Sequence, residues 1–253
     1  MNTPATSPPF ILSVKLKRDA VASFDQYPFC LPAVRHMDTL DLHPAVTFLV
    51  GENGSGKSTL LEAIAVAWGF NPEGGTRSFR FQTRGSHSAL HQQLRLIKTL
   101  HRPRDGFFLR AESFFNLATE IEHLDEDPSA GPRIIDSYGG RSLHEQSHGE
   151  SFFALMMERF HGQSFFVLDE PEAALSPSRQ LAMIRRLHEL VLARAQFIVA
   201  THSPILMAYP HARIYEITDN GLHSVSYEQT EHYAVAKRFL NDPGKQLEVL
   251  LRQ

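Results

Sequence analysis

Residues 51 to 59, GENGSGKST, form a glycine-rich loop that ends in a lysine and two hydroxyl side chains. The spacing matches G-x-x-x-x-G-K-[ST], which binds phosphate groups where it joins a strand to a helix. Glycines let several backbone N–H groups point into one concavity, and the helix N-terminus adds partial positive charge. Lys57 is then expected to reach the β- and γ-phosphates, Ser58 to bind Mg²⁺ and Thr59 to hydrogen-bond a phosphate oxygen. The predicted nucleotide-binding residues of this loop are Gly51, Glu52, Asn53, Gly54, Ser55, Gly56, Lys57, Ser58 and Thr59.

Two adjacent acids, Asp169 and Glu170, follow the apolar run FFVL at 165–168. Ligands bind at the carboxyl ends of strands in open α/β sheets, so this position favours chemistry. We expect Asp169 to hold Mg²⁺, directly or through water, and Glu170 to polarise the attacking water. Two carboxylates are needed because one that is bound to a metal is a poor base.

Apolar runs that alternate with helical patterns must position these residues. The run at 46–50 predicts a buried strand before the glycine loop, and Leu60–Trp68 has helical spacing after it. Strands alternating with helices indicate a mainly parallel sheet. Further strands are predicted at 10–18, near Phe79, and at 107–109, 165–168 and 197–200, and further helices at 88–100, 114–124, 150–161 and 178–194.

The remaining organisation follows from turn signals and spacing. Asp219-Asn220-Gly221 lies between two short apolar runs and predicts an antiparallel hairpin. We expect one α/β domain over 1–253, with a mainly parallel central sheet, this antiparallel β addition, and an inserted helical lobe at roughly 85–161.

Composition limits the class of protein. Lys and Arg number 25 against 28 Asp and Glu, a formal charge of −3, so the whole chain has no general attraction to nucleic acid. The segment 77–110 is locally basic, with Asp105 as its one acid, and is either a solvated face or a partner surface. Cys30 is the single cysteine, residues 1–9 lack the pattern of a signal peptide, and no apolar run reaches the roughly 20 residues that span a membrane. These features predict a cytoplasmic location, with membrane association only through a partner.

Together the two motifs resemble those of ABC-type ATPases, and three later segments extend the resemblance. PEAALSP at 171–177 follows the carboxylates as the D-loop does in that family. ATHSP at 200–204 follows the next predicted strand, where the family has its switch histidine. SHGES at 147–151 precedes a helix, where the signature Leu-Ser-Gly-Gly-Gln belongs. The resemblance implies the P-loop NTPase fold with ATP and Mg²⁺ as ligands.

Within that family the chain is similar to small stand-alone ATPases related to the SMC and RecF-like branch. GFFLRAESFFN at 106–116 and the DEPEAALSP and ATHSP stretches are typical of this subgroup. The ATHSP form argues against a transporter subunit, which usually has an acid after the histidine.

Two motifs depart from the family pattern. His148 and Glu150 replace the usual glycine and glutamine of the signature, yet the resemblance still implies that Ser147 and the Gly149 amide contact a γ-phosphate. A glutamine is also expected at the end of a strand between the two motifs. Glu112 takes that place after 107–109 and would bind Mg²⁺ or its water, with Gln82 as the rival position.

The resemblance assigns His202 to the γ-phosphate as a hydrogen-bond donor. The contact with the adenine base is poorly specified, since Tyr27 could stack on the base or pack in the core.

A single phosphate loop and a single signature per chain imply a two-fold dimer that sandwiches two ATP molecules. The resemblance therefore predicts an ATPase that dimerises on ATP and acts as a switch, on nucleic acid or in a stress or defence system. The alternatives are the nucleotide-binding subunit of a membrane transporter and a nucleotide sensor with negligible turnover.

Overall fold

The computed structural model describes residues 8–76, 88–110, 114–125, 133, 135–136, 140, 142 and 148–252. Within them, a six-stranded sheet has the order β5-β6-β7-β3-β8-β9. All neighbouring strands are parallel except β9, which pairs antiparallel with β8. The strands are β3 (Val46–Gly51), β5 (Asp105–Arg110), β6 (Ser164–Asp169), β7 (Gln196–Ala200), β8 (Ala212–Thr218) and β9 (Gly221–Val225).

A second, antiparallel sheet has the order β2-β1-β4, formed by β1 (Ile11–Leu16), β2 (Thr39–Asp41) and β4 (Leu94–Lys98). The buried Gln196 side chain joins it to the central sheet. Its Oε1 accepts from the backbone N–H groups of Phe10 and Ile11 at 2.9 and 3.0 Å, and its Nε2 donates to the carbonyl of Ile11 at 2.8 Å. These bonds satisfy the amide group in a buried position, where an unpaired one would be costly.

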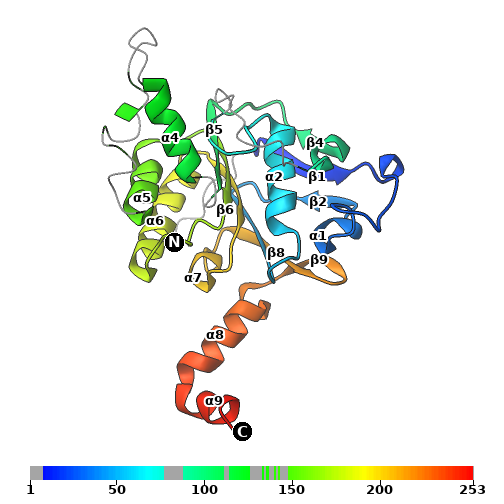
Figure 1. Ribbon diagram of the computed structural model, residues 1–253, viewed down its shortest axis with the longest axis vertical. Helices are drawn as coiled ribbons and strands as arrows, with labels where there is room; N and C mark the ends of the chain where they lie inside the picture. The colour runs from blue at the N-terminus through cyan, green and yellow to red at the C-terminus, as the bar shows by residue number, and fades with distance from the viewer. Residues whose placement is uncertain are drawn as a thin grey trace.

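Helices cover both faces of the central sheet (Figure 1). On one side lies α2 (Lys57–Trp68), between the central sheet and the small sheet. On the other side lie α4 (Phe114–Asp125), α5 (His148–Glu158) and α6 (Pro177–Leu192). The short helical segments are η1 (Arg18–Ala20), α1 (Pro32–Arg35), α3 (Leu90–Gln93), α7 (Pro204–Met207) and η3 (Tyr227–Gln229).

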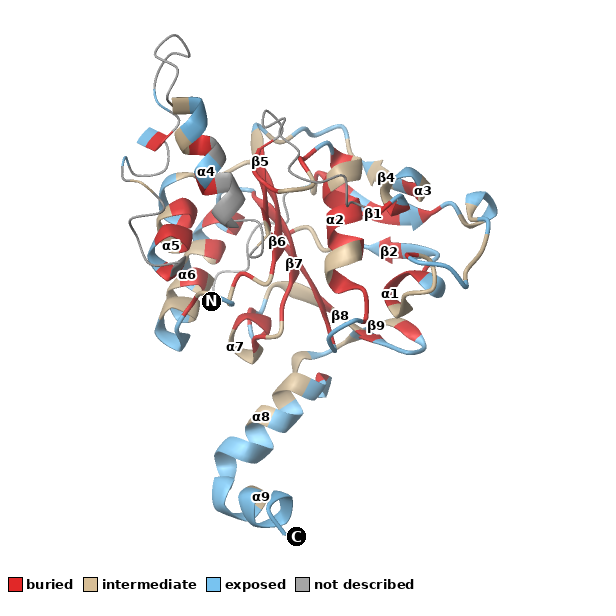
Figure 2. Ribbon diagram, viewed as in Figure 1, coloured by how far each residue is buried: buried red, intermediate tan, exposed pale blue. Residues whose placement is uncertain are grey.

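The core has two apolar clusters, one on each face of the central sheet, and β3, β6 and β7 are buried along their length (Figure 2). Successive residues point to opposite faces, so Phe48 belongs to one cluster and Leu49 to the other. Burial on both faces explains why these strands are continuously apolar.

Two C-terminal helices, α8 (Glu231–Asn241) and α9 (Pro243–Leu250), extend away from this body (Figure 1). None of their residues is buried. No helix within the described ranges is long and apolar enough to cross a membrane.

The predicted α/β fold with a mainly parallel sheet and an antiparallel addition is confirmed, as are the strands at 10–18, 46–50, 107–109, 165–168 and 197–200. The hairpin at Asp219–Gly221 is the β8–β9 turn. Helices α4 and α5 fall inside the range proposed for the helical lobe, whose boundaries stay a prediction. The strand proposed near Phe79 lies outside the described residues.

The helix predicted over 88–100 is wrong. Only residues 90–93 are helical, and β4 follows directly as a strand that pairs antiparallel with β1. Leu94 and Leu96 face the second core cluster, a period of two that fits a strand. Pairing with β1 satisfies the backbone of this segment, which the sequence pattern alone could not reveal.

Candidate nucleotide site

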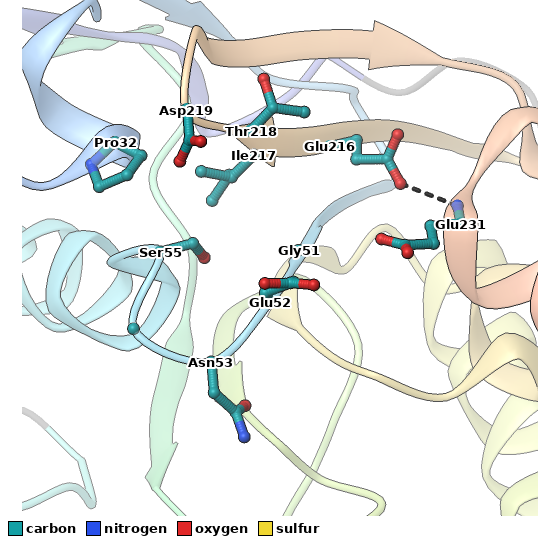
Figure 3. Close-up of a pocket in the computed structure, with 11 residues that line it drawn as sticks. Pro32, Gly51, Glu52, Asn53, Ser55, Glu216, Ile217, Thr218, Asp219 and Glu231 are labelled. Carbon is teal, nitrogen blue, oxygen red and sulfur yellow. Dashed lines mark hydrogen bonds between the residues drawn. The ribbon is translucent and has the colours of Figure 1, made fainter. Parts of the chain in front are cut away.

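The glycine loop joins β3 to α2 at the carboxyl edge of the central sheet. Gly51, Gly54 and Gly56 have φ values of +148°, +81° and +96°, which side chains rarely adopt. A Cβ on Gly51 would lie 2.7 Å from the carbonyl oxygen of Ile217 on β8. Glycine is therefore required where the loop leaves the sheet, and the loop lines a cavity beside the end of β8 (Figure 3).

Lys57, the first residue of α2, is buried beneath this loop. Its Nζ donates to the carbonyl oxygens of Gly51 and Glu52, both at 2.8 Å. Burial lowers the pKa of Lys57, and the carboxylates of Glu170 and Asp169 oppose that shift. The ammonium group is thus partly desolvated beside the loop, where an anionic phosphate would be a strong partner.

Ser58 and Asp169 bring the two predicted motifs together. The Ser58 Oγ donates to Asp169 Oδ1 at 2.9 Å, across 111 residues of sequence. Asp169 is 6% exposed and ends β6 next to β7. Within the described ranges, no group of three His, Cys, Asp or Glu side chains could hold a metal by itself. One carboxylate and one hydroxyl beside a phosphate cradle fit Mg²⁺, which binds through few protein oxygens together with substrate phosphates.

Glu170 and His202 face each other beside this pair. Glu170 has φ +49° and its backbone N–H donates to the carbonyl of Ala200 at 2.9 Å. Its Oε1 lies 3.6 Å from His202 Nε2. That nitrogen is buried and has no hydrogen-bond partner among the described residues. A left-handed backbone at a non-glycine residue is costly, and such strain concentrates at functional sites.

Burial, followed by the nearby charge of Lys57, lowers the pKa of His202, which favours a neutral imidazole. A neutral ring with its proton on Nε2 could donate one hydrogen bond toward the phosphate loop.

Glu172 binds the backbone of His202. Its Oε1 accepts from the backbone N–H of His202 at 2.5 Å. Burial raises the pKa of Glu172, although hydrogen bonds from His202 and Thr201 oppose the shift. The sequence pattern places Glu172 in the D-loop segment and does not reveal this contact.

Two cavities flank the phosphate loop. One, of about 490 Å³, lies between the loop, α1 and the end of β8 (Figure 3). The other, of about 700 Å³, is bounded by the phosphate loop, by the segment after β7 that contains His202 and Pro204 (the histidine segment), and by α8. The first is lined by Pro32, Gly51, Glu52, Asn53, Gly54, Ser55, Glu216, Ile217, Thr218, Asp219 and Glu231.

The structure brings the glycine loop, Asp169, Glu170 and His202 to one edge of the sheet. Gly149 instead lies at the start of α5, where a Cβ would meet the Ala174 carbonyl at 2.5 Å. Tyr27 is 65% exposed and lines neither cavity. Three predicted residues, Ser147, Glu112 and Gln82, lie outside the described residues.

The site also includes His232, which the sequence pattern does not reveal. It comes from α8 and lies against His202, with His232 Nε2 at 3.1 Å from His202 Nδ1. No sequence signal separates it from the other histidines, since its partner lies 30 residues away on another element.

Two family profiles match the chain. One, described as "AAA domain", matches residues 24–125, and the other, described as "AAA domain, putative AbiEii toxin, Type IV TA system", matches residues 100–208. Both descriptions name an AAA domain, and the two matches together span residues 24–208, so the chain carries a P-loop ATPase domain of the AAA type. The P-loop ATPase family predicted from the motifs is therefore confirmed.

This P-loop ATPase is also similar to solved structures. The SMC head domain from Thermotoga maritima is 19% identical, with 74% of this chain and 92% of that chain covered and a TM-score of 0.37. An ATP-binding cassette of an ABC transporter in its ADP conformation is 18% identical, with 86% and 93% covered and a TM-score of 0.45. No curated protein matches the chain in sequence.

Proposed function

We propose that this ATPase binds and hydrolyses ATP, and that ATP binding makes two copies associate. The observation that supports it most directly is the hydrogen bond between Ser58 and Asp169. It joins the proposed Mg²⁺ ligand of the glycine loop to that of the carboxylate motif. Beside that pair, Glu170 and His202 lie 3.6 Å apart, and we assign Glu170 to the attacking water and His202 to the γ-phosphate.

The roles divide as follows. The N–H groups of the glycine loop and Lys57 hold the phosphates, and Ser58, Asp169 and Glu112 are the proposed Mg²⁺ ligands. A bound Mg²⁺ supplies positive charge that neutralises phosphate oxygens in the transition state. Glu170 orients and polarises the attacking water. These roles follow the family pattern for ATP.

Association of two copies is proposed from the family pattern, and the position of Gly149 is compatible with it. Gly149, at the start of α5, packs against Ala174 and Arg179, so it faces the D-loop segment of its own chain. We propose that Ser147 and Gly149 contribute to the nucleotide site of a second copy. Loss of the γ-phosphate would then remove contacts on both sides, and the dimer would separate.

The target of the switch is proposed to be nucleic acid in a defence or stress system. The description of the second family profile names a toxin–antitoxin system, which supports a defence role. The basic segment 77–110 supports a nucleic-acid target. Of that segment, residues 77–87 lie outside the described residues, whereas Arg95, Arg102 and Arg104 are exposed.

The deciding experiment measures the molecular mass of Glu170→Gln in solution, with and without Mg-ATP. Without the carboxylate, hydrolysis is blocked while ATP binding remains, so the closed state accumulates and the mass doubles only with Mg-ATP. Lys57→Ala in the same background is the control. It removes the phosphate contact, so we expect the mass of a monomer both with and without Mg-ATP. Wild-type hydrolysis rates in Glu170→Gln would refute the catalytic role. A monomer with ATP bound would refute self-association and favour a different partner subunit.

A further inference from the structure

His232 is the second residue of α8, and it meets the histidine of the nucleotide site from a separate element. Its Nε2 lies 3.1 Å from Nδ1 of His202, and the two ring centroids are 5.3 Å apart at an interplanar angle of 53°. The rings therefore meet edge to edge through one hydrogen bond. Both side chains line the cavity of about 700 Å³, together with Glu52 and Asn53 of the phosphate loop.

The first turn of α8 is fixed, so His232 is held in place. Thr230 is fully buried, and its Oγ1 accepts from the Tyr233 N–H at 3.3 Å as the helix N-cap. The Glu231 N–H donates to Glu216 Oε1 at the end of β8, at 2.9 Å (Figure 3). These bonds fix the backbone from which His232 reaches His202.

The hydrogen bond between the two rings constrains their protons. Only one of the two facing nitrogens can carry the shared proton. If His232 Nε2 donates, His202 Nδ1 accepts, and the proton of a neutral His202 must then be on Nε2, the nitrogen that faces Glu170 at 3.6 Å. This is the tautomer that a donor to the γ-phosphate needs, because a bare Nε2 would repel a phosphate oxygen.

We propose that His232 is a positioning residue that holds the ring and the tautomer of His202, and so links α8 to the nucleotide site. The proposal rests on the proposed contact between His202 and the γ-phosphate. Burial is the first cause that lowers the pKa of each histidine, which is consistent with two neutral rings joined by one N–H···N hydrogen bond.

The contact between His202 and His232 also connects the site to the C-terminal arm, which consists of α8 and α9. Beyond the first turn, α8 and α9 have no buried residue (Figure 2). Their apolar side chains Val235, Leu240 and Val249 are more than half exposed. The arm is therefore oriented by its first turn, where His232 lies. A shift of His202 between nucleotide states would reach the arm through this contact.

The test compares His232→Ala and His232→Gln with wild type in steady-state ATP hydrolysis. We expect His232→Ala to lower kcat about 10- to 100-fold, the usual effect of removing a group that orients a functional histidine, with little change in KM. The glutamine amide can donate to His202 Nδ1, so His232→Gln recovers most of the rate. His223→Ala, an exposed histidine on β9, is the matched control and keeps the wild-type rate.

A double-mutant cycle separates positioning from a structural role. If His232 acts through His202, adding His232→Ala to His202→Ala causes no further loss of kcat. Additive losses, or an unchanged kcat in His232→Ala, would overturn the proposal.

A second readout does not depend on hydrolysis. The imidazole ¹⁵N chemical shifts of His202 report which nitrogen carries the proton, and we expect an Nε2–H tautomer in wild type that His232→Ala converts to a mixture. An Nδ1–H tautomer in wild type, or one that is unchanged in His232→Ala, overturns the proposal. If the wild-type protein does not hydrolyse ATP, the proposed function fails while this measurement still decides the role of His232.

Discussion

Glu172 shows how one side chain holds the histidine segment in place. It accepts a hydrogen bond from the His202 N–H and lies close to Glu170, while its second oxygen is buried without a hydrogen-bond partner among the described residues. An ionised carboxylate in this position is incompletely compensated. Its protonation state should therefore affect the stability of the fold.

We expect Glu172→Gln to gain stability relative to wild type as pH rises. Burial raises the pKa of Glu172 above its ordinary value of 4.5, so the fold keeps the proton to a higher pH than the unfolded chain does. The protonated carboxyl therefore stabilises fully below 4.5, and that contribution is lost as pH rises through the raised pKa. Urea unfolding from pH 4 to pH 8 measures the difference between the two proteins.

The exposed Glu228→Gln serves as the control for that comparison. A difference between Glu172→Gln and wild type that does not change with pH would show that the carboxyl of Glu172 does not titrate differently in the folded and unfolded states.

At the scale of the elements, the site depends on how closely β3 and β8 approach. The strands are parallel, and Gly51 pairs with Ile217 at the end of the ladder. The loop can leave β3 here only because Gly51 has no Cβ.

Gly51→Ala is expected to destabilise the protein by about 2–4 kcal/mol, through the unfavourable backbone angle together with the clash against the Ile217 carbonyl. Gly54→Ala is the matched control, because its φ is also positive but its Cβ would meet open space. We expect it to cost only about 1–2 kcal/mol, the strain of the backbone angle alone. Urea unfolding measures the loss of stability in both variants. Equal losses would mean that the clash between the new Cβ at position 51 and the Ile217 carbonyl does not destabilise the fold.

The whole molecule has a small negative formal charge, so binding to nucleic acid would depend on a local patch. The exposed Arg95, Arg102 and Arg104 lie in and after β4, in the basic segment. Lys98 is instead directed over the Trp68 ring, 4.3 Å from its centroid, and Arg110 pairs with Glu62 at 2.6 Å.

Replacing Arg95, Arg102 and Arg104 by Glu is expected to abolish DNA binding by the Mg-ATP form of Glu170→Gln. Binding through phosphate contacts weakens steeply with salt, with a slope close to the number of phosphates neutralised. Fluorescence anisotropy at several salt concentrations measures both. Arg185, Arg194 and Arg252, replaced together by Glu, give the same charge change elsewhere on the surface. DNA binding that survives the first triple variant, or that does not depend on salt, would remove the basic segment as the contact surface.

The sequence alone predicted the glycine loop, the carboxylate pair and the sheet that carries them. A glycine at a positive φ and an acid at the end of a buried strand are set by local backbone geometry, and alternating runs set the order of strands and helices. The same reasoning assigned residues 88–100 to a helix, because pairing of that segment with β1 is a contact across some 80 residues.

Only the tertiary structure decided which side chains surround His202. Glu172 and His232 each lie 30 residues from it in sequence, on opposite sides, and reach it from two separate segments. A local pattern cannot encode such contacts, because they depend on how the segment after β6, the end of β7 and the start of α8 pack together around the site. The sequence determined the chemistry of the phosphate loop, and packing decided how its histidine is held.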